Sequence, residues 1–262
     1  MCPHPRPPFQ VIYNPNTAEY VMWYRVVPFT ASHTALNWTG EAFAVATAAT
    51  PEGPFRTVQP HAYVQQGSGG DFSVYVDANG GVGAEAASAT KAYILYTAHS
   101  TDVRIVVEEL DTNFYNSRKD VPATPPFPPQ PVEAPAMFRR GDWYYVTFGH
   151  TCCYCLAGSD VYIYASAHPL GPYMALGNIG LNSNGACCVT RAQQNYVAAI
   201  GGGADNGQGT LLWTGTRWGS APDGLFDHSF QTWLPLVWEE GGQSTPPRPL
   251  NLTWVDAFEL DV

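Results

Sequence analysis

The chain repeats one arrangement of apolar and polar positions. Two short runs in which apolar residues alternate with polar ones flank a turn rich in Asn, Asp, Gly or Pro, and this arrangement is typical of a β-hairpin. A further strand pattern follows each of the first three hairpins. The sequence shows no sustained helical period, so it predicts an all-β fold. The hairpins are expected at residues 9–25, 71–100, 134–150 and 193–215.

The hairpins recur at a spacing of roughly 60 residues, with several strands in each repeat. Self-similarity of this kind is typical of a β-propeller, in which small antiparallel sheets, the blades, are arranged around a central axis. We therefore predict a single β-propeller domain over residues 1–262. Its repeats are expected at approximately residues 7–60, 70–120, 132–178 and 189–262.

Composition agrees with a sheet protein and narrows the range of partners. Of the 262 residues, 13% are charged and 13% are aromatic, and 23 prolines and 25 glycines are spread along the chain. The net charge is −10 with only 12 Lys and Arg residues, so we expect no nucleic acid and no membrane as partner. No apolar run reaches the ~18 residues of a membrane span. Neutral ligands fit this composition better, and we expect a monomer without a cofactor.

The cysteines bear on the compartment in which the protein works. Apart from Cys2 they form two clusters, which are Cys152, Cys153 and Cys155, and Cys187 and Cys188. Disulfides between the clusters are favoured over buried thiols, and a zinc site is disfavoured because regular Cys-x-x-Cys pairs are missing, so we expect no metal. The triplets Asn37-Trp-Thr and Asn251-Leu-Thr are possible glycosylation sites. Both features favour a secreted protein, although the sequence starts without a signal peptide.

Propeller geometry brings the starts of the inner strands together. The innermost strand of each blade begins near the axis, so residues at the start of each hairpin should meet at one mouth of the channel. These positions hold Asp71, Glu133 and either Gln193 or Gln194. Taken alone, Glu133 is equally well explained as a solvated loop residue or a strand cap. Equivalent placement in successive repeats favours a shared site of two carboxylates and an amide.

Several segments resemble the successive blade signatures of one enzyme family. They are "PPFQVIYNPNTAEYVMWYR", "GDFSVYVDANG", "EAPAMFRRGDWYYV", "SAHPLGPY", "WTGTRW" and "WLPL", in this order. Together they resemble glycoside hydrolase family 43, particularly its exo-β-1,3-galactanase-like members, from about Arg6 to Val262. The resemblance implies a five-bladed β-propeller. Four repeats are visible, so we expect about four blades in this chain and the first blade of the family before Met1.

The resemblance also assigns roles to individual positions. Glu133, in its "EAP" setting, matches the general acid of the family, and Asp71 matches the aspartate that tunes and orients that acid. Gln193 of "RAQQNYV" aligns with the glutamine that galactanase-like members place in the base region. The usual aspartate base of the family lies in the first blade and has no counterpart here. Gln243 of "GGQST" matches the family segment in its letters, but it falls in the turn of the last repeat, so we assign it no role.

These residue types suit acid-assisted hydrolysis of a glycosidic bond. Inversion needs a proton donor for the leaving oxygen and a water held on the opposite face of the sugar, with the two groups ~6.5–9.5 Å apart. Glu133 supplies the proton in this hypothesis, and burial together with a nearby Asp71 charge would keep it protonated. Gln193 has no useful proton affinity, so it would hold the water by hydrogen bonds.

The implied function is an inverting glycoside hydrolase that cleaves terminal β-linked galactose or a similar sugar from an oligo- or polysaccharide. Trp218, Gln194 and Tyr13 are the candidate substrate-binding residues. The chain departs from the family pattern where prolines replace a glutamate before "FQVIYN" and where Thr216 replaces an aspartate. These departures keep a second hypothesis open, a propeller that binds carbohydrate or a protein partner without catalysis.

Overall fold

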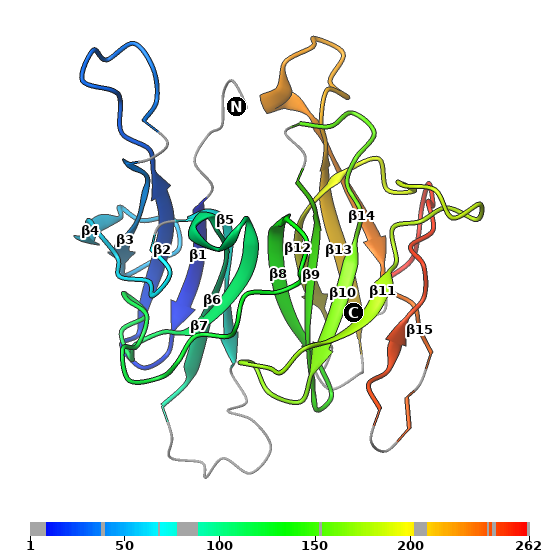
Figure 1. Ribbon diagram of the computed structural model, residues 1–262, viewed down its shortest axis with the longest axis horizontal. Helices are drawn as coiled ribbons and strands as arrows, with labels where there is room; N and C mark the ends of the chain where they lie inside the picture. Colours follow the sequence, from blue (N-terminus) through cyan, green and yellow to red (C-terminus); the bar gives the residue numbers. More distant parts are fainter. Residues whose placement is uncertain are drawn as a thin grey trace. The chain divides into compact units, whose positions relative to one another are not determined.

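The computed structural model divides the chain into two compact units. The N-terminal unit is Pro3–Gln130, and the C-terminal unit begins at Pro131. Both are built from antiparallel sheets, and each is described by itself (Figure 1). The structure describes residues 9–37, 40–67, 69–77, 89–151, 154–201, 209–239, 241–242 and 245–260.

The N-terminal unit contains two sheets whose strands follow one another in sequence order. The first sheet has the order β1-β2-β3-β4 and the second has the order β5-β6-β7. The first consists of β1 (Phe9–Asn14), β2 (Glu19–Val26), β3 (Ala42–Ala48) and β4 (Arg56–Gln59). The second consists of β5 (Gly69–Asp77), β6 (Lys91–Ala98) and β7 (Arg104–Glu109), with the 3-10 helix η2 (His99–Thr101) after β6.

The turn between β1 and β2 shows how local chemistry fixes a hairpin. Asn14 is buried, and its side-chain oxygen accepts a hydrogen bond from the backbone N–H of Asn16 at 2.9 Å. This Asx turn reverses the chain at the Asn-Pro position that the sequence indicates. The Asn14 amide also donates to the Thr112 carbonyl at 3.0 Å, so it anchors the turn to the loop after β7.

The core of the N-terminal unit is apolar and aromatic. Strand β6 buries nearly every side chain, so both of its faces are covered. Trp23 is fully buried and donates its indole N–H to the Phe114 carbonyl at 2.8 Å. The first strands of the two sheets also meet, because the Gln10 amide exchanges two hydrogen bonds with the backbone of Val74, at 2.7 and 2.9 Å. Gln10 thereby satisfies backbone groups on the open side of β5.

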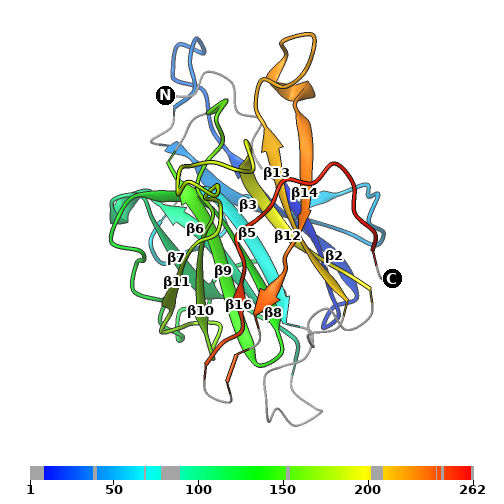
Figure 2. The same ribbon diagram turned by 90° about the vertical axis from the view of Figure 1, so that its right-hand side faces the viewer.

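The C-terminal unit has a four-stranded sheet, a three-stranded sheet and a short strand pair among its described residues. The four-stranded sheet has the order β11-β10-β9-β8 and consists of β8 (Val132–Arg140), β9 (Trp143–His150), β10 (Tyr162–Ser166) and β11 (Met174–Asn178). Figure 2 shows the three-stranded sheet of β12 (Gln193–Ile200), β13 (Thr210–Arg217) and β14 (Phe230–Pro235). The remaining elements are the 3-10 helix η4 (Phe226–His228), β15 (Trp238–Glu239) and β16 (Arg248–Pro249).

Strands β8 and β12, the first strands of their sheets, pack against each other in the C-terminal unit. Aromatic rings fill the core beside them. Phe138 stacks on Tyr145 with 5.2 Å between ring centroids and an angle of 10° between the ring planes. Trp213 of β13 is fully buried in the same core. The contact of β8 with β12 is what brings the candidate site residues of this unit together.

Three strands share one irregularity close to their starts. In each of β5, β8 and β12, one extra residue interrupts the pairing with the next strand and makes a β-bulge, a feature that bends a strand and is frequent beside active sites. The bulges lie between Gly69 and Phe72, between Glu133 and Ala136, and between Gln194 and Tyr196. Glu133 lies three residues before Ala136, where the bulge of β8 ends, and Gln193 lies three residues before Tyr196, where the bulge of β12 ends. Asp71 lies one residue before Phe72, where the bulge of β5 ends.

The prediction of an all-β fold is confirmed. Each expected hairpin is present as two adjacent antiparallel strands, and the pairs are β1–β2, β5–β6, β8–β9 and β12–β13. Among the residues that the structure describes, no helix is both long enough and apolar enough to cross a membrane.

The cysteines differ from the prediction. The structure pairs Cys187 with its neighbour Cys188. Because one sulfur forms one disulfide, this pairing leaves neither residue for the expected bridge to the first cluster. Cys152 and Cys153 lie outside the described residues.

Candidate active site

Glu133 lies at the bulge of β8, and the sequence explains why the strand is irregular there. Pro135 has no N–H to donate to β9, and Ala134 adopts a positive φ of 57°. Gly149 lies opposite Glu133 in the register, and a Cβ at that position would collide with the Ser159 hydroxyl. The backbone therefore bends at a crowded place, and the Glu133 side chain is left half-buried.

A chain of hydrogen bonds links Glu133 to the next sheet. The Nε2 atom of Gln193 donates to Oε1 of Glu133 at 2.8 Å. The Oε1 atom of the same amide accepts a hydrogen bond from the indole Nε1–H of Trp218 at 2.7 Å. Gln193 is buried, and both ends of its amide are thereby oriented. The structure thus brings together the candidate acid and the candidate water-holding residue, as well as a tryptophan that the sequence assigns to substrate.

Trp218 belongs to an aromatic group beside Gln193. The Tyr154 ring stands edge-on to Trp218 at 4.7 Å, and the partly exposed Phe226 lies 5.2 Å from Tyr154, measured between centroids. Sugar rings present apolar C–H faces, which pack on such aromatic surfaces. Tyr154 and Phe226 were missed in the sequence because neither lies in a strand, so no strand alternation indicates which way the side chain points.

Gln194 corrects one prediction. It is only 2% exposed, and its two amide atoms are occupied within the protein. Its Nε2 donates to the Ala134 carbonyl at 2.8 Å, and its Oε1 accepts from the indole N–H of Trp213 at 3.1 Å. A substrate cannot reach the Gln194 amide, because it is almost fully enclosed and bonded to the backbone of Ala134 and to the fully buried Trp213. Gln194 is therefore a structural link that holds the bulge of β8 to β12 and β13, and not a substrate-binding residue.

Tyr13 lies in the N-terminal unit, so its role as a substrate-binding residue stays a prediction. It pairs in register with Tyr20 next to the turn between β1 and β2, and the two rings lie 5.1 Å apart. The Tyr13 ring is exposed.

Asp71 lies in the N-terminal unit, so its placement relative to Glu133 stays a prediction. Desolvation raises the pKa of Asp71, while the charges of Arg25 and His99 act to lower it. Glu41 completes this group: its carboxylate lies 2.8 Å from Nδ1 of His99 and 3.9 Å from Nη1 of Arg25. Only Asp71 was predicted from the sequence. The other three come from the ends of separate strands and loops, so no local motif connects them.

His99 gives this cluster a measurable pH dependence. Its pKa is raised above 6.5, chiefly by the hydrogen bond with Glu41. Because the folded chain then binds the proton more tightly than the unfolded chain, the stabilisation is fully present below pH 6.5 and is lost as the pH rises through the raised pKa. The pKa of Asp71 is also raised, so its contribution to stability is likewise lost as the pH rises, but at lower pH than that of His99. His99→Gln should therefore cost stability at about pH 6 and much less at about pH 9.

Urea unfolding of the wild type and of His99→Gln at several pH values checks this expectation. The exposed His61 provides the matched control His61→Gln, for which we expect little difference at any pH. A loss of stability in His99→Gln that is the same across the whole pH range would contradict the role of the Glu41 contact.

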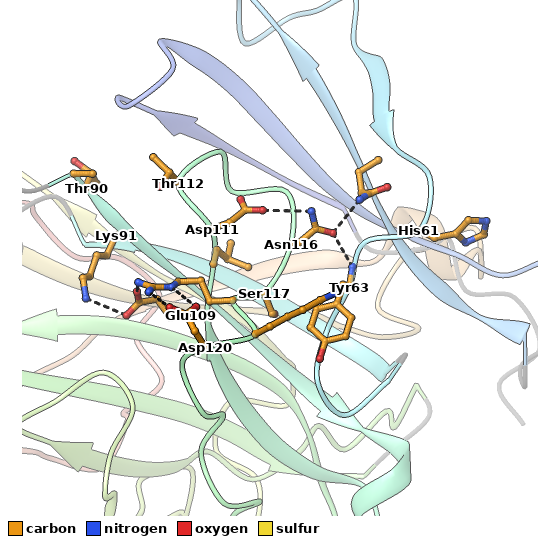
Figure 3. Close-up of a pocket in the computed structure, with 15 residues that line it drawn as sticks. His61, Tyr63, Thr90, Lys91, Glu109, Asp111, Thr112, Asn116, Ser117 and Asp120 are labelled. Atoms are coloured by element: carbon orange, nitrogen blue, oxygen red, sulfur yellow. Dashed lines mark hydrogen bonds and ion pairs between the residues drawn. The ribbon is translucent and has the colours of Figure 1, made fainter.

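A separate polar cavity of about 860 Å³ lies in the N-terminal unit (Figure 3). Some of its charged groups are paired: Glu109 accepts from Arg118 at 2.7 Å and from Lys91 at 3.1 Å, and Arg118 also pairs with Asp120. None of the predicted site residues lines this cavity. We assign no chemistry to it.

Comparison of the sequence with models of protein families and with curated proteins finds no match. Comparison of the structure does find similar proteins. An exo-β-1,3-galactanase from Phanerochaete chrysosporium with galactose is 22% identical, with 92% of this chain and 48% of that chain covered and a TM-score of 0.64. An exo-β-1,3-galactanase from Clostridium thermocellum has the same identity and coverage and a TM-score of 0.68. A family 43 β-1,3-galactosidase with galactodeoxynojirimycin is 17% identical, with 95% and 75% covered and a TM-score of 0.69.

The similarity extends over nearly all of this chain, which spans about half the length of the two galactanases. At these levels of identity the similarity concerns the fold. The several antiparallel sheets described above therefore have the all-β fold of the family 43 exo-β-1,3-galactanases.

Proposed function

We propose that this protein is a glycoside hydrolase that removes terminal β-linked galactose or a similar sugar from a polysaccharide, with Glu133 as the acid. The observation that carries the proposal is the hydrogen-bonded chain from Trp218 through Gln193 to Glu133. It places a carboxyl group, an oriented amide and an aromatic surface in one small region. Solved structures with the same fold include a galactanase with galactose and a glutamate-to-glutamine variant with β-1,3-galactotriose.

Each residue has a distinct task in this reaction. Glu133 protonates the glycosidic oxygen, which makes the leaving alcohol neutral and lowers the barrier to cleavage. Its partial burial limits access of bulk water to the carboxyl group. Trp218 and the neighbouring rings provide a surface for the sugar. Gln193 positions groups by hydrogen bonds, because an amide cannot take a proton from water.

The direct contact of Gln193 with Glu133 sets a condition on an inverting mechanism. The two catalytic groups of an inverting glycosidase lie ~6.5–9.5 Å apart, which leaves space for the sugar and the attacking water. Here the amide and the carboxyl group are 2.8 Å apart. Gln193 therefore orients Glu133 while the site is empty, and it has to release the carboxyl group when a sugar enters. Its N–H is then available to hold the water.

Hydrolysis of β-1,3-galacto-oligosaccharides tests this function, with the anomer of the first product read by NMR. We expect release of galactose with inverted configuration. Gln193→Ala should lower kcat by roughly 10²-fold for oligosaccharides and activated aryl galactosides alike, because water placement is needed for both. Gln130→Ala, at an exposed residue in the segment before β8, is the matched control and should keep full activity.

Retention of configuration would contradict the water-holding role of Gln193. Binding of the oligosaccharides without any hydrolysis would favour the second candidate, a non-catalytic carbohydrate-binding protein. One observation supports that candidate. The group that contacts Oε1 of the predicted acid is the amide of Gln193, which cannot act as a base.

A further inference from the structure

Three potential metal ligands converge in the C-terminal unit, apart from the proposed catalytic residues. The side chains are His150 at the end of β9, Asp160 just before β10 and Cys187 in the loop before β12. Their ligand atoms all lie within 4.8 Å of one another. Nitrogen, carboxylate and sulfur donors in one small group are the combination that Zn²⁺ binds in proteins.

The contact of His150 with Asp160 holds two potential ligand atoms side by side. Nδ1 of His150 lies 2.8 Å from Oδ2 of Asp160, and the backbone N–H of Asp160 lies 3.2 Å from the same Nδ1. The imidazole ring is thereby oriented toward the carboxylate, so both donors are already placed next to each other before an ion binds.

Neighbouring side chains orient the Asp160 carboxylate by hydrogen bonds. Oδ1 of Asp160 accepts from the Asn178 amide at 2.8 Å, and Oδ2 lies 3.3 Å from the Tyr162 hydroxyl. Such second partners fix the orientation of a ligand and typically change metal affinity by 10–100-fold. The exposed pair of His228 and Asp223 has the same two residue types in contact, but no cysteine is grouped with it among the described residues.

The sulfur is accessible from solvent. Cys187 and Cys188 line a cavity of about 840 Å³, together with Leu156, Arg191 and Trp254. Cys187 itself is exposed. A hydrated ion and a small reductant can therefore reach it. In the oxidised form its sulfur is bonded to Cys188 and is a poor ligand, since the thiolate is the species that binds metal.

We propose that His150, Asp160 and Cys187 form a zinc site that opens when the Cys187–Cys188 disulfide is reduced. A dithiol supplies the two electrons. One of its thiolates attacks the Cys188 sulfur and displaces Cys187 as a thiolate; the second thiolate then closes the disulfide of the reductant and releases Cys188. Zn²⁺ binds the Cys187 thiolate in place of its proton, which goes to solvent.

The distances suit this ion. Zn–N and Zn–O bonds of about 2.0 Å and Zn–S bonds of about 2.3 Å put tetrahedral donors roughly 3.3–3.5 Å apart. The observed separations, from 2.8 Å up to a limit of 4.8 Å, bracket these values. Because Cys187 is exposed, its side chain can move closer to His150 and Asp160 when the ion binds. Water or Cys188 completes the fourth position. The sequence gives no local signal for such a site, because its ligands come from three separate loops and strand ends.

Zinc titration of the intact protein, with a chromophoric chelator as competitor, tests the proposal. Protein treated with a dithiol and then freed of it under inert gas should bind one Zn²⁺ per chain, and untreated protein should bind at least tenfold more weakly. His150→Ala, Asp160→Asn and Cys187→Ser should each lower the affinity by about tenfold or more. With Co²⁺ as probe, the reduced protein should show thiolate-to-cobalt charge-transfer absorption, and Cys187→Ser should not.

Two control variants make the test specific. Cys188→Ser frees the Cys187 sulfur from its partner, so this variant should bind zinc without reductant. His228→Ala removes the histidine of the exposed His–Asp pair and should leave zinc binding unchanged. Urea unfolding of each variant checks that it is folded. Failure of the reduced wild type to bind zinc stoichiometrically, or unchanged binding by Cys187→Ser, would overturn the proposal.

Discussion

Glu133→Gln is expected to lower the rate of oligosaccharide hydrolysis by roughly 10²–10⁴-fold. The substitution keeps the shape of the side chain and its contact with Gln193 but removes the proton that the leaving alcohol needs. An aryl galactoside with an acidic phenol as leaving group needs little protonation, so its hydrolysis should fall much less. The measurement is kcat/KM for both substrates in wild type and variant.

Two comparisons make this result interpretable. Glu239→Gln, at an exposed position of β15, changes the same functional group away from the site and should keep the activity. If Glu133→Gln slowed both substrates to the same extent, Glu133 would act by maintaining the structure and not by donating a proton. That outcome would remove the central residue of the proposed mechanism.

Gln194→Met is expected to destabilise the fold by about 2–6 kcal/mol, because the variant leaves two buried groups without partners at about 1–3 kcal/mol each. The groups are the indole N–H of fully buried Trp213 and the Ala134 carbonyl. Methionine has nearly the volume of glutamine, so little of the loss comes from a cavity. Equilibrium unfolding in urea measures the change.

The same substitution at an exposed site separates hydrogen bonding from residue type. Gln130→Met should change the free energy of unfolding by less than about 0.5 kcal/mol, since Gln130 lies on the surface. Equal losses in Gln194→Met and Gln130→Met would mean that the buried network contributes little. The assignment of Gln194 as a structural link would then be wrong.

The hairpins could be predicted because their signals are local. Alternation and turn residues such as Asn14 act over a few positions, and the same pattern occurs four times in the chain. The meeting of Glu133 with Gln193 followed from that repetition, since equivalent positions in neighbouring repeats lie side by side. Both residues lie close to a bulge: Glu133 is the last paired residue before the bulge of β8, and Gln193 lies one residue before Gln194, the last paired residue before the bulge of β12.

The rest depends on features that no short segment contains. The sequence does not say that the Gln193 amide contacts the carboxyl group directly, because that depends on where side chains turn at a bulge. Burial of Gln194 depends on Trp213, which lies on the next strand. The cluster of Asp71 with Glu41 and His99 joins distant parts of the N-terminal unit. Tertiary packing decides these contacts.

The bulge of β8 has a consequence for motion. Because of the extra residue, the Ala134 carbonyl is held by a side chain, Gln194, and Pro135 has no N–H to contribute. The start of β8 is therefore fastened to the sheet less firmly than its middle, and segments with few backbone hydrogen bonds open locally at lower free energy than the whole fold. Warming should loosen this segment first. The acid would then lose its position while most of the sheet is still intact, so the activity would have a lower temperature limit than the fold.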